Sequence, residues 1–273
     1  MFAPDLPTIC VGLRGIVYGE LFVEGASHDL HSGMYGGAAP NPIQAIAEIL
    51  CALKDRDGHI QIPGFYDRVA APSPKEREAW ARLPFREKEF TEQEMGADAL
   101  VGEPGVPVLE RLWARPTLEV HGIRGGFTAE GAKTVIPARA VAKISTRLVA
   151  DQRIDEATGQ LRAAIERACP KGVKAEFKVL HAGAPSLTNP DNRFIHDAAE
   201  AMKQLFAKEA VYIRSGGSIP IVGVFDQALG IPSVLMGFGL PDDNLHAPNE
   251  KFHLPNFFRG IEAVARYLEI LGG

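Results

Sequence analysis

The sequence predicts an α/β protein in two parts: a ferredoxin-like α+β sandwich, followed by a piece of a three-layer α/β unit. Between residues 15 and 180 the expected elements follow the order strand, helix, strand, strand, helix, strand, which is the order of a split βαβ sandwich. After residue 183 strands and helices alternate, which indicates helices layered on a sheet.

The sandwich is predicted to open with a strand and a capped helix. Residues 15–23 are rich in the β-branched and aromatic side chains that favour strands, and a glycine-rich loop follows at residues 28–37. Asn41 is then a suitable cap, and Pro42 suits the first position of a helix. The apolar residues at helical spacing, which we expect to form its buried face, are Ile43, Ile46, Ala47, Leu50 and Leu53.

The second half of the sandwich starts at residue 117. Residues 117–122 and 141–149 are expected to be strands, and in the longer one successive side chains point to opposite faces. Its expected inner residues are Ala142, Ile144, Thr146 and Leu148; its expected outer residues are Lys143, Ser145 and Arg147. A helix through residues 154–168 and a strand at residues 174–180 complete the predicted order.

The segment between the two halves, residues 63–116, has a different texture. Seven prolines interrupt it, and residues 75–94 are crowded with charge. We expect short helices packed on a surface as an insertion rather than a core element. A flexible linker is the alternative, which the four large aromatic side chains in need of burial disfavour: Trp80, Phe85, Phe90 and Trp113.

The last 90 residues, 184–273, should form only part of an α/β unit. We expect helices at 194–206 and 255–271 and strands at 211–213 and 232–236. The final helix should turn Ile261, Val264, Leu268 and Leu271 inward. Two or three strands make a thin sheet, so we expect a further part of this unit to precede Met1.

Composition excludes several classes of protein. A net charge of −5, without blocks of like charge, argues against a nucleic-acid partner. No apolar run approaches the ~20 residues of a membrane span, and no secretory leader is visible, so no membrane partner is expected. The cysteines are sparse, odd in number and without a CxxC pair, which fits buried thiols in the cytoplasm: Cys10, Cys51 and Cys169.

Three polar loops are candidates for chemistry. Residues 215–218 follow a strand and precede an apolar helix, so their glycine amides could hold a carboxylate, although an ordinary tight turn is an open alternative. His246 follows an apolar strand, at the end of a sheet where sites of open α/β units lie, but one histidine cannot make a zinc site. His31 lies in the glycine-rich loop, where a histidine is more often simply solvated.

Two further interpretations are disfavoured. Residues 126–134 approach a phosphate-loop motif, but Ala132 separates its glycine from its lysine. Ser218 could be a nucleophile in principle, but it lacks the Gly-x-Ser-x-Gly elbow of serine hydrolases.

Taken together, the motifs resemble those of the zinc metallo-dipeptidases of the carnosinase and cytosolic non-specific dipeptidase type. More distant relatives in that superfamily are acetylornithine deacetylase and succinyl-diaminopimelate desuccinylase. The resemblance covers nearly the whole chain, in the order Tyr18 to Val23, Asp29 to Gly33, Gly131 to Pro137, Arg147, Gly216 to Pro220, and His246 to Glu250.

The resemblance implies a catalytic domain interrupted by a ferredoxin-like lid that makes a homodimer. Residues 1–12 would end an N-terminal catalytic segment, residues 13–183 would form the lid with the insertion 63–116, and residues 184–273 would complete the catalytic domain. It also implies two zinc ions per subunit, or other divalent metals. The His-x-Asp and Glu-Glu motifs that hold them in the family are absent from this chain.

Roles follow from the same resemblance. His246 is similar to the C-terminal zinc ligand, and His31 to the lid histidine that reaches across the dimer and stabilises the oxyanion. Thr134 resembles a second residue donated in trans. Arg147 resembles the residue that grips the carboxylate of a small peptide substrate, with Gly217 and Ser218 contacting the same end.

We therefore expect a metal-dependent dipeptidase in which a zinc-bound hydroxide attacks the peptide bond. This chain alone should be inactive, because the other ligands are missing. Two alternatives stay open: a non-catalytic dimerisation module, and an N-acyl amino-acid deacylase of the same superfamily. The Asp-Leu-His-Ser-Gly motif and the insertion favour the dipeptidase.

Overall fold

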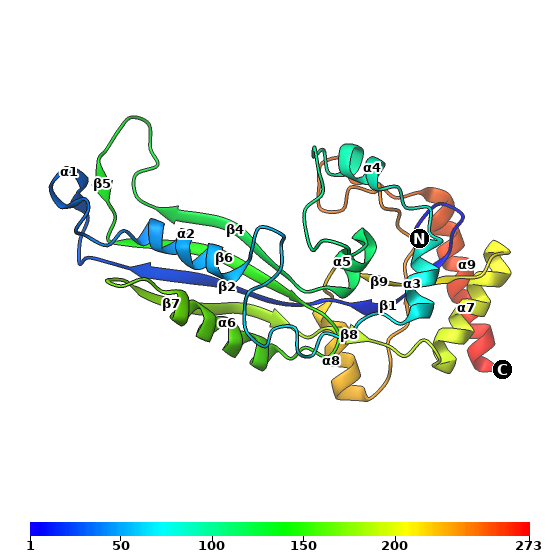
Figure 1. The fold of residues 1–273 in the computed structure, drawn as a ribbon. Helices are drawn as coiled ribbons and strands as arrows, with labels where there is room; N and C mark the ends of the chain where they lie inside the picture. Colours follow the sequence, from blue (N-terminus) through cyan, green and yellow to red (C-terminus); the bar gives the residue numbers. More distant parts are fainter.

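The computed structural model describes all 273 residues except the side chain of Gln227. The molecule is elongated, with two sheets placed end to end (Figure 1). Strand β1 (Thr8–Leu13) lies in one sheet and β2 (Gly15–Glu24) in the other, so a single residue, Arg14, separates the two strands. We call the part built on β2 the sandwich and the part built on β1 the second unit.

The sandwich sheet has the strand order β4-β6-β2-β7, and all neighbours are antiparallel. Its strands are β4 (Thr117–Gly125), β6 (Arg139–Leu148), β2, and β7 (Lys174–Gly183). Helices α2 (Pro42–Leu53) and α6 (Ile154–Ala168) cover one face (Figure 1). This arrangement confirms the ferredoxin-like prediction, although β4 and β7 run further than expected.

The core of the sandwich lies between the sheet and its two helices. Strand β6 alternates as predicted, since the four residues expected inside are buried: Ala142, Ile144, Thr146 and Leu148. Ser145 is the exception on the outer face, because it is buried although the prediction placed it outside. Its Oγ lies 2.8 Å from Nε2 of His121 on β4, so a hydrogen bond satisfies this buried hydroxyl.

Helix α2 starts as its cap predicts, but its buried face differs from the predicted one. The Asn41 side chain accepts a hydrogen bond from the backbone N–H of Ile43 at 3.0 Å, and Pro42 occupies the first turn. The buried residues are Pro42, Ala45, Ile46, Ile49 and Leu53. Ala47 is exposed and Ile43 and Leu50 are half-buried, because the helix is rotated toward β2, β6 and α6.

The second unit is built around β1. Strand β9 (Val211–Ser215) lies parallel to β1 on one side, while β8 (Ser186–Leu187) and β10 (Leu235–Met236) are antiparallel to it on the other. Helices α7 (Arg193–Phe206) and α9 (Leu254–Gly272) pack against each other, and α8 (Pro220–Leu229) follows β9. The alternation of strands and helices confirms the α/β class, with a β10 shorter than the predicted strand.

The prediction for α9 was wrong in its orientation. Ile261 is 59% exposed, and Val264 and Leu268 are exposed as well, whereas Ala263 and Asn256 are buried. Among the residues that the structure describes, α7 and the segment around Phe238 pack on the opposite side of the helix. The predicted apolar stripe through Ile261, Val264 and Leu268 is therefore present on α9, but none of the described residues covers it.

The segment 63–116 forms α3 (Pro74–Ala81), α4 (Glu87–Glu89), a π-helical turn η1 (Phe90–Glu94) and α5 (Val108–Ala114). The expectation of short helices is confirmed, but the expectation of a mere surface insertion was wrong. Helices α3 and α5 pack against β9, and Trp80 is 4% exposed among Leu83, Leu109 and Ala114. Its indole N–H donates to the Tyr212 carbonyl at 3.1 Å, so the segment is part of the core of the second unit.

The remaining elements form the tip of the sandwich that lies furthest from the second unit. Strand β3 (Leu30–His31) pairs with β5 (Val135–Ile136), and the one-turn helix α1 (Ser32–Tyr35) follows β3 (Figure 1). None of the described helices combines the length and apolarity needed to span a membrane.

Ile144→Ala should destabilise the sandwich by roughly 2–5 kcal/mol, because it leaves a cavity beneath a fully buried side chain. Urea denaturation followed by circular dichroism measures this loss. The matched control is Leu180→Ala, on a residue of β7 that is 57% exposed; it should cost less than ~1 kcal/mol. Equal losses would contradict this account of the core.

Candidate functional site

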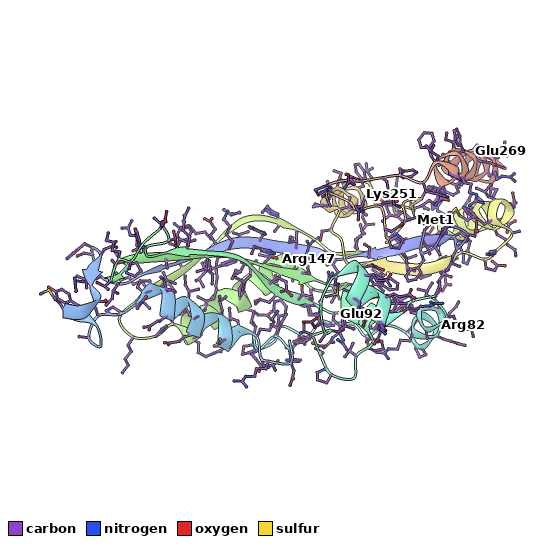
Figure 2. All side chains as sticks on the ribbon, turned by 90° about the horizontal axis from the view of Figure 1, so that it is seen from above. Met1, Arg82, Glu92, Arg147, Lys251 and Glu269 are labelled. Atoms are coloured by element: carbon purple, nitrogen blue, oxygen red, sulfur yellow. The ribbon has the colours of Figure 1, made fainter. Side chains whose placement is uncertain are left out.

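The sandwich and the second unit meet at a hydrogen bond between two predicted site residues. Arg147 near the end of β6 donates from Nη1 to the Ser218 Oγ at 2.7 Å. The Ser218 hydroxyl in turn donates to the backbone carbonyl of Arg14 at 2.5 Å. Figure 2 shows Arg147 where the long sheet reaches the second unit. The structure therefore brings together residues that are 71 positions apart in the sequence.

The loop that carries Ser218 connects β9 to α8 and is short. The backbone N–H of Gly217 donates to the Ser215 Oγ at 3.1 Å, which tightens the turn. Gly216 fills a space where a side chain would not fit, since a Cβ there would lie 2.8 Å from the Arg14 guanidinium and 2.9 Å from the Leu112 carbonyl. The amides of this loop and the first turn of α8 lie beside a guanidinium, an arrangement that favours an anion.

Arg14 is the residue that sequence reasoning missed. Its backbone N–H donates to the Ser215 carbonyl at 3.3 Å, and its Nε donates to the Gly216 carbonyl at 2.9 Å. Burial, and then the nearby charge of Arg147, lower its pKa to about 10, so it keeps its charge at neutral pH. The one signal for it in the sequence was a charged residue set between two apolar strands.

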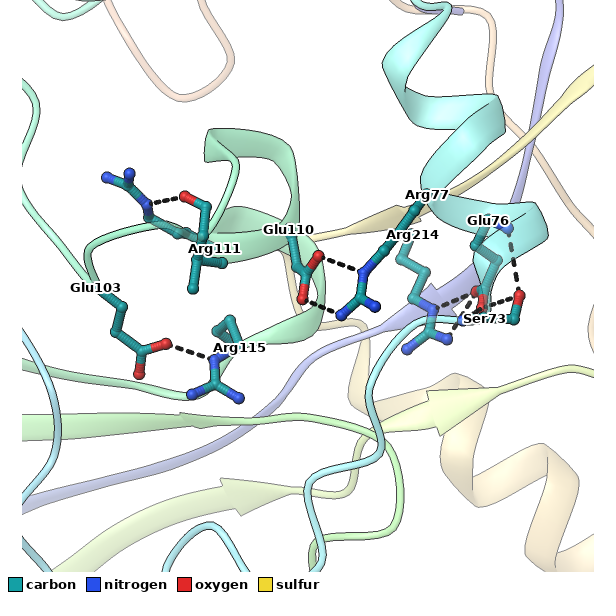
Figure 3. A network of polar contacts seen from close by, with 9 residues as sticks. Ser73, Glu76, Arg77, Glu103, Glu110, Arg111, Arg115 and Arg214 are labelled. Carbon is teal, nitrogen blue, oxygen red and sulfur yellow. Dashed lines mark hydrogen bonds and ion pairs between the residues drawn. The ribbon is translucent and has the colours of Figure 1, made fainter.

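An ion pair fixes the strand that leads into the Ser218 loop. Arg214 on β9 is 6% exposed and donates from Nε and Nη2 to Glu76 Oε1 at 2.9 and 2.7 Å (Figure 3). Glu76 also accepts from the N–H and hydroxyl of Ser73, which caps α3. Burial alone would raise the pKa of Glu76, but the Ser73 N–H and Arg214 outweigh burial, and the pKa is lowered from 4.5.

A second polar cluster joins the two ends of the same segment to each other. Arg115 donates to Glu103 at 2.6 Å (Figure 3). The Tyr66 hydroxyl donates to the same carboxylate at 2.8 Å. Burial and this bond to Glu103 raise the pKa of Tyr66. Arg77 and Glu110 form a further pair between α3 and α5, with both contacts at 2.9 Å (Figure 3). These contacts hold the segment 63–116 in place beside Arg14 and the Ser218 loop.

His31 and Thr134 lie together, but not with the residues above. The His31 Nδ1 accepts from the N–H of Gly33 at 3.0 Å and caps α1, and the Ser32 N–H donates to the Thr134 carbonyl at 3.0 Å. Both residues are exposed at the tip of the sandwich. The ten residues of β2 separate this tip from the Arg14 junction, which corresponds to about 30 Å of extended chain.

His246 occupies a turn with φ of 60° and is exposed. Its neighbour Leu245 lines a cavity of about 830 Å³ together with Ser215 and Ile219, the residues on either side of the Ser218 turn. The loop of His246 and the loop of Ser218 therefore border one cavity. The described side chains contain no group of three or more His, Cys, Asp or Glu residues that could hold a metal ion, so these residues do not by themselves fit a zinc site.

Comparisons with known proteins agree with this arrangement. Residues 11–173 match the M20 peptidase dimerisation domain. The chain is 32% identical over 268 residues to the Cys-Gly metallodipeptidase dug1 of Schizosaccharomyces pombe, which covers 97% of this chain and 56% of that protein. It is 30% identical over 267 residues to the human Beta-Ala-His dipeptidase, which covers 96% of this chain and 52% of that protein.

Solved structures give the same result. The di-peptidase Dug1p of Saccharomyces cerevisiae superimposes with a TM-score of 0.84 at 32% identity, over 98% of this chain and 57% of that one. Human carnosine dipeptidase 1 gives a TM-score of 0.81 at 30% identity, over 99% and 57%. The chain thus spans little more than half the length of the relatives that it matches.

Glu76→Gln should destabilise the second unit by roughly 3 kcal/mol at pH 7, because Arg214 stays buried without its partner. The lowered pKa of Glu76 means that its contribution is present above pH 4.5 and is lost as the pH falls through its folded-state value. Thermal melts from pH 7 to pH 3 should therefore show the gap to the unmodified chain closing below pH 4.5. Glu78→Gln, in an exposed pair with Arg82, is the control and should stay within about 0.5 kcal/mol throughout. A gap that widens in acid would contradict this role of Glu76.

Proposed function

The chain belongs to the M20 peptidase family, and on that premise we propose that it forms the dimerisation lid and the C-terminal catalytic part of a metal-dependent dipeptidase. The observation that carries this proposal is the 2.7 Å contact between Arg147 of the sandwich and Ser218 of the second unit. It puts a guanidinium, a hydroxyl and a turn of glycine amides at the junction of the two parts.

We propose that this junction binds the free carboxylate of a dipeptide or short peptide. A guanidinium offers parallel N–H groups that match the two oxygens of a carboxylate. Ser218 would contribute its hydroxyl and Gly217 its backbone to the same group. Arg14 adds a second fixed positive charge nearby, which increases the attraction for an anion.

His31 and Thr134 would serve the site of a second subunit. The length of β2 supports this proposal, since about 30 Å separates their tip from Ser218 in the same chain. A homodimer formed through the sandwich would bring the tip of one subunit over the junction of its partner. In that position His31 would stabilise the developing negative charge on the scissile carbonyl oxygen, and Thr134 would contact the substrate beside it.

His246 is the one residue of this chain that we assign to the metals. Two zinc ions, or other divalent cations, would supply activated water for hydrolysis when bound in the complete site. Their remaining ligands would come from outside this chain, because its described residues offer no cluster of metal-binding side chains. This chain by itself should therefore be inactive.

The proposed division of the chain is residues 1–12 as the end of a catalytic segment, 13–183 as the lid and 184–273 as the rest of the catalytic domain. Within the lid range, the segment 63–116 packs into the core of the second unit and so belongs physically with the catalytic part. The exposed apolar stripe of α9 supports the view that further polypeptide covers this domain. We also propose a cytoplasmic enzyme, consistent with three free cysteines. A dimerisation module and an N-acyl amino-acid deacylase are the competing functions, and the dipeptidase names of the relatives at 30% identity or more favour peptide hydrolysis.

The metal assignment can be tested on this chain. Calorimetric titration with zinc chloride at pH 7 should show no tight binding of two equivalents, and Cys-Gly and β-Ala-His should not be hydrolysed. Weak binding of one equivalent, lost in His246→Ala, is the expected maximum for a single exposed imidazole. Tight binding of two zinc ions by the unmodified chain would refute the proposal that its ligands are incomplete.

The dimer should form through the free edge of β4. Both β4 and β7 are edge strands of the sandwich sheet. β4 exposes Val120 and Ile123, whereas the end of β7 lies beside α8. Light scattering should give the mass of a dimer for the unmodified chain and of a monomer for Ile123→Asp, because the charge would be buried in the pairing edge. Leu180→Asp on the opposite edge is the matched control and should stay dimeric. The reverse result would place the interface at β7.

A further inference from the structure

Arg14 holds three residues of the Ser215–Ser218 turn at once. Its backbone N–H donates to the Ser215 carbonyl at 3.3 Å, and its Nε donates to the Gly216 carbonyl at 2.9 Å. Its own carbonyl accepts from the Ser218 hydroxyl at 2.5 Å. Both the backbone and the side chain of Arg14 thus make hydrogen bonds to a turn that lies more than 200 positions away in the sequence.

These bonds determine where the Ser218 hydroxyl points. A serine hydroxyl has one proton to donate and accepts through its lone pairs. Because the proton goes to the Arg14 carbonyl, the lone pairs are left for the Arg147 guanidinium, which donates to them at 2.7 Å. If the Arg14 carbonyl moved, the hydroxyl would be free to rotate away from Arg147.

Unlike the side chain of Arg147, the side chain of Arg14 is not available to bind a ligand. Its Nε is engaged by Gly216, and its Nη1 lies 3.5 Å from the Arg115 carbonyl. Its Nη2 faces Gly216 so closely that a methyl group there would come within 2.8 Å. The guanidinium is therefore packed against backbone, and Arg147 remains the one that can turn toward an incoming carboxylate.

We propose that Arg14 is a positioning residue of the carboxylate site: it clamps the Ser215–Ser218 turn so that Ser218 and Arg147 are pre-aligned, without itself touching the substrate. This inference rests on the proposed function. It assigns the junction residue between β1 and β2 to the same site as Arg147, so the link between the two units and the recognition of the substrate depend on one residue, through both its backbone and its side chain.

The test compares a free and a capped carboxylate on the chain itself. Glycylglycine and glycylglycinamide, titrated at pH 7 and constant ionic strength and followed by NMR, report recognition of the carboxylate as the ratio of their two affinities. The unmodified chain should prefer the free acid, and Arg147→Met should abolish this preference. Arg14→Lys keeps the charge and the backbone contacts but loses the Nε bond to the Gly216 carbonyl. It should reduce the preference about ten-fold, the scale of one charge-assisted hydrogen bond.

Gly216→Ala provides the second variant, because it keeps every charge and displaces the turn from Arg14 through its new methyl group. It should lower the preference to the same extent. Arg139→Lys, in an exposed pair with Glu24, is the matched control and should leave the ratio unchanged. Thermal melts of all variants confirm that they are folded before the ratios are compared.

The outcomes separate the two proposals. An undiminished preference in both Arg14→Lys and Gly216→Ala would overturn the role of Arg14 and leave the proposed function standing. Equal weakening of both ligands in these variants would indicate a general loss of structure and also overturn it. If the unmodified chain showed no preference for the acid, or Arg147→Met kept it, the carboxylate site itself would be refuted, and the role of Arg14 with it.

Discussion

A two-stranded antiparallel ribbon runs through both halves of the molecule, and the sheets of both units are built on it. The pair β1 and β8 in the second unit continues as the pair β2 and β7 in the sandwich, with Gly12 opposite Leu187 and Ile16 opposite Gly183. The strands are so close at the crossing that a Cβ on Gly15 would lie 2.6 Å from Pro185. Because a slip by one residue would turn every side chain to the wrong face, the ribbon fixes the register of both sheets together.

Local periodicity predicted the elements well and their surroundings less well. The alternation of β6 and the cap of α2 are properties of a few adjacent residues, and both were correct. The buried face of α2 was not, because two overlapping stripes satisfy the helical spacing, and packing against the sheet selects the one with Ala45 and Ile49. For α9 the stripe through Ile261 was visible in the sequence, but periodicity does not tell which polypeptide covers it.

In the candidate site, too, the residues that belong to a local sequence pattern were predicted, and those whose contacts are distant in the sequence were not. Ser218 and Gly217 could be found because a glycine turn before an apolar helix is a local pattern, and Arg147 because it falls on the outer face of a recognisable strand. Their assigned roles came from the resemblance to a family. Arg14 and the Arg214–Glu76 pair had no such pattern, since their contacts join residues 202 and 138 positions apart. Only the assembled fold shows that Glu76 and Trp80 of the segment 63–116 hold β9 through Arg214 and Tyr212.

Because the same ribbon crosses from one unit to the other, a tilt at Arg14 would move the whole sandwich. Its two strands cross the junction with one residue between β1 and β2, and the tip that carries α1 projects about 30 Å beyond it. At that radius a tilt of about 10° at Arg14 would sweep the tip through about 5 Å, a distance comparable to the spacing of neighbouring strands. A small change in the packing around Arg14 would thereby produce a larger displacement at the opposite end of the molecule.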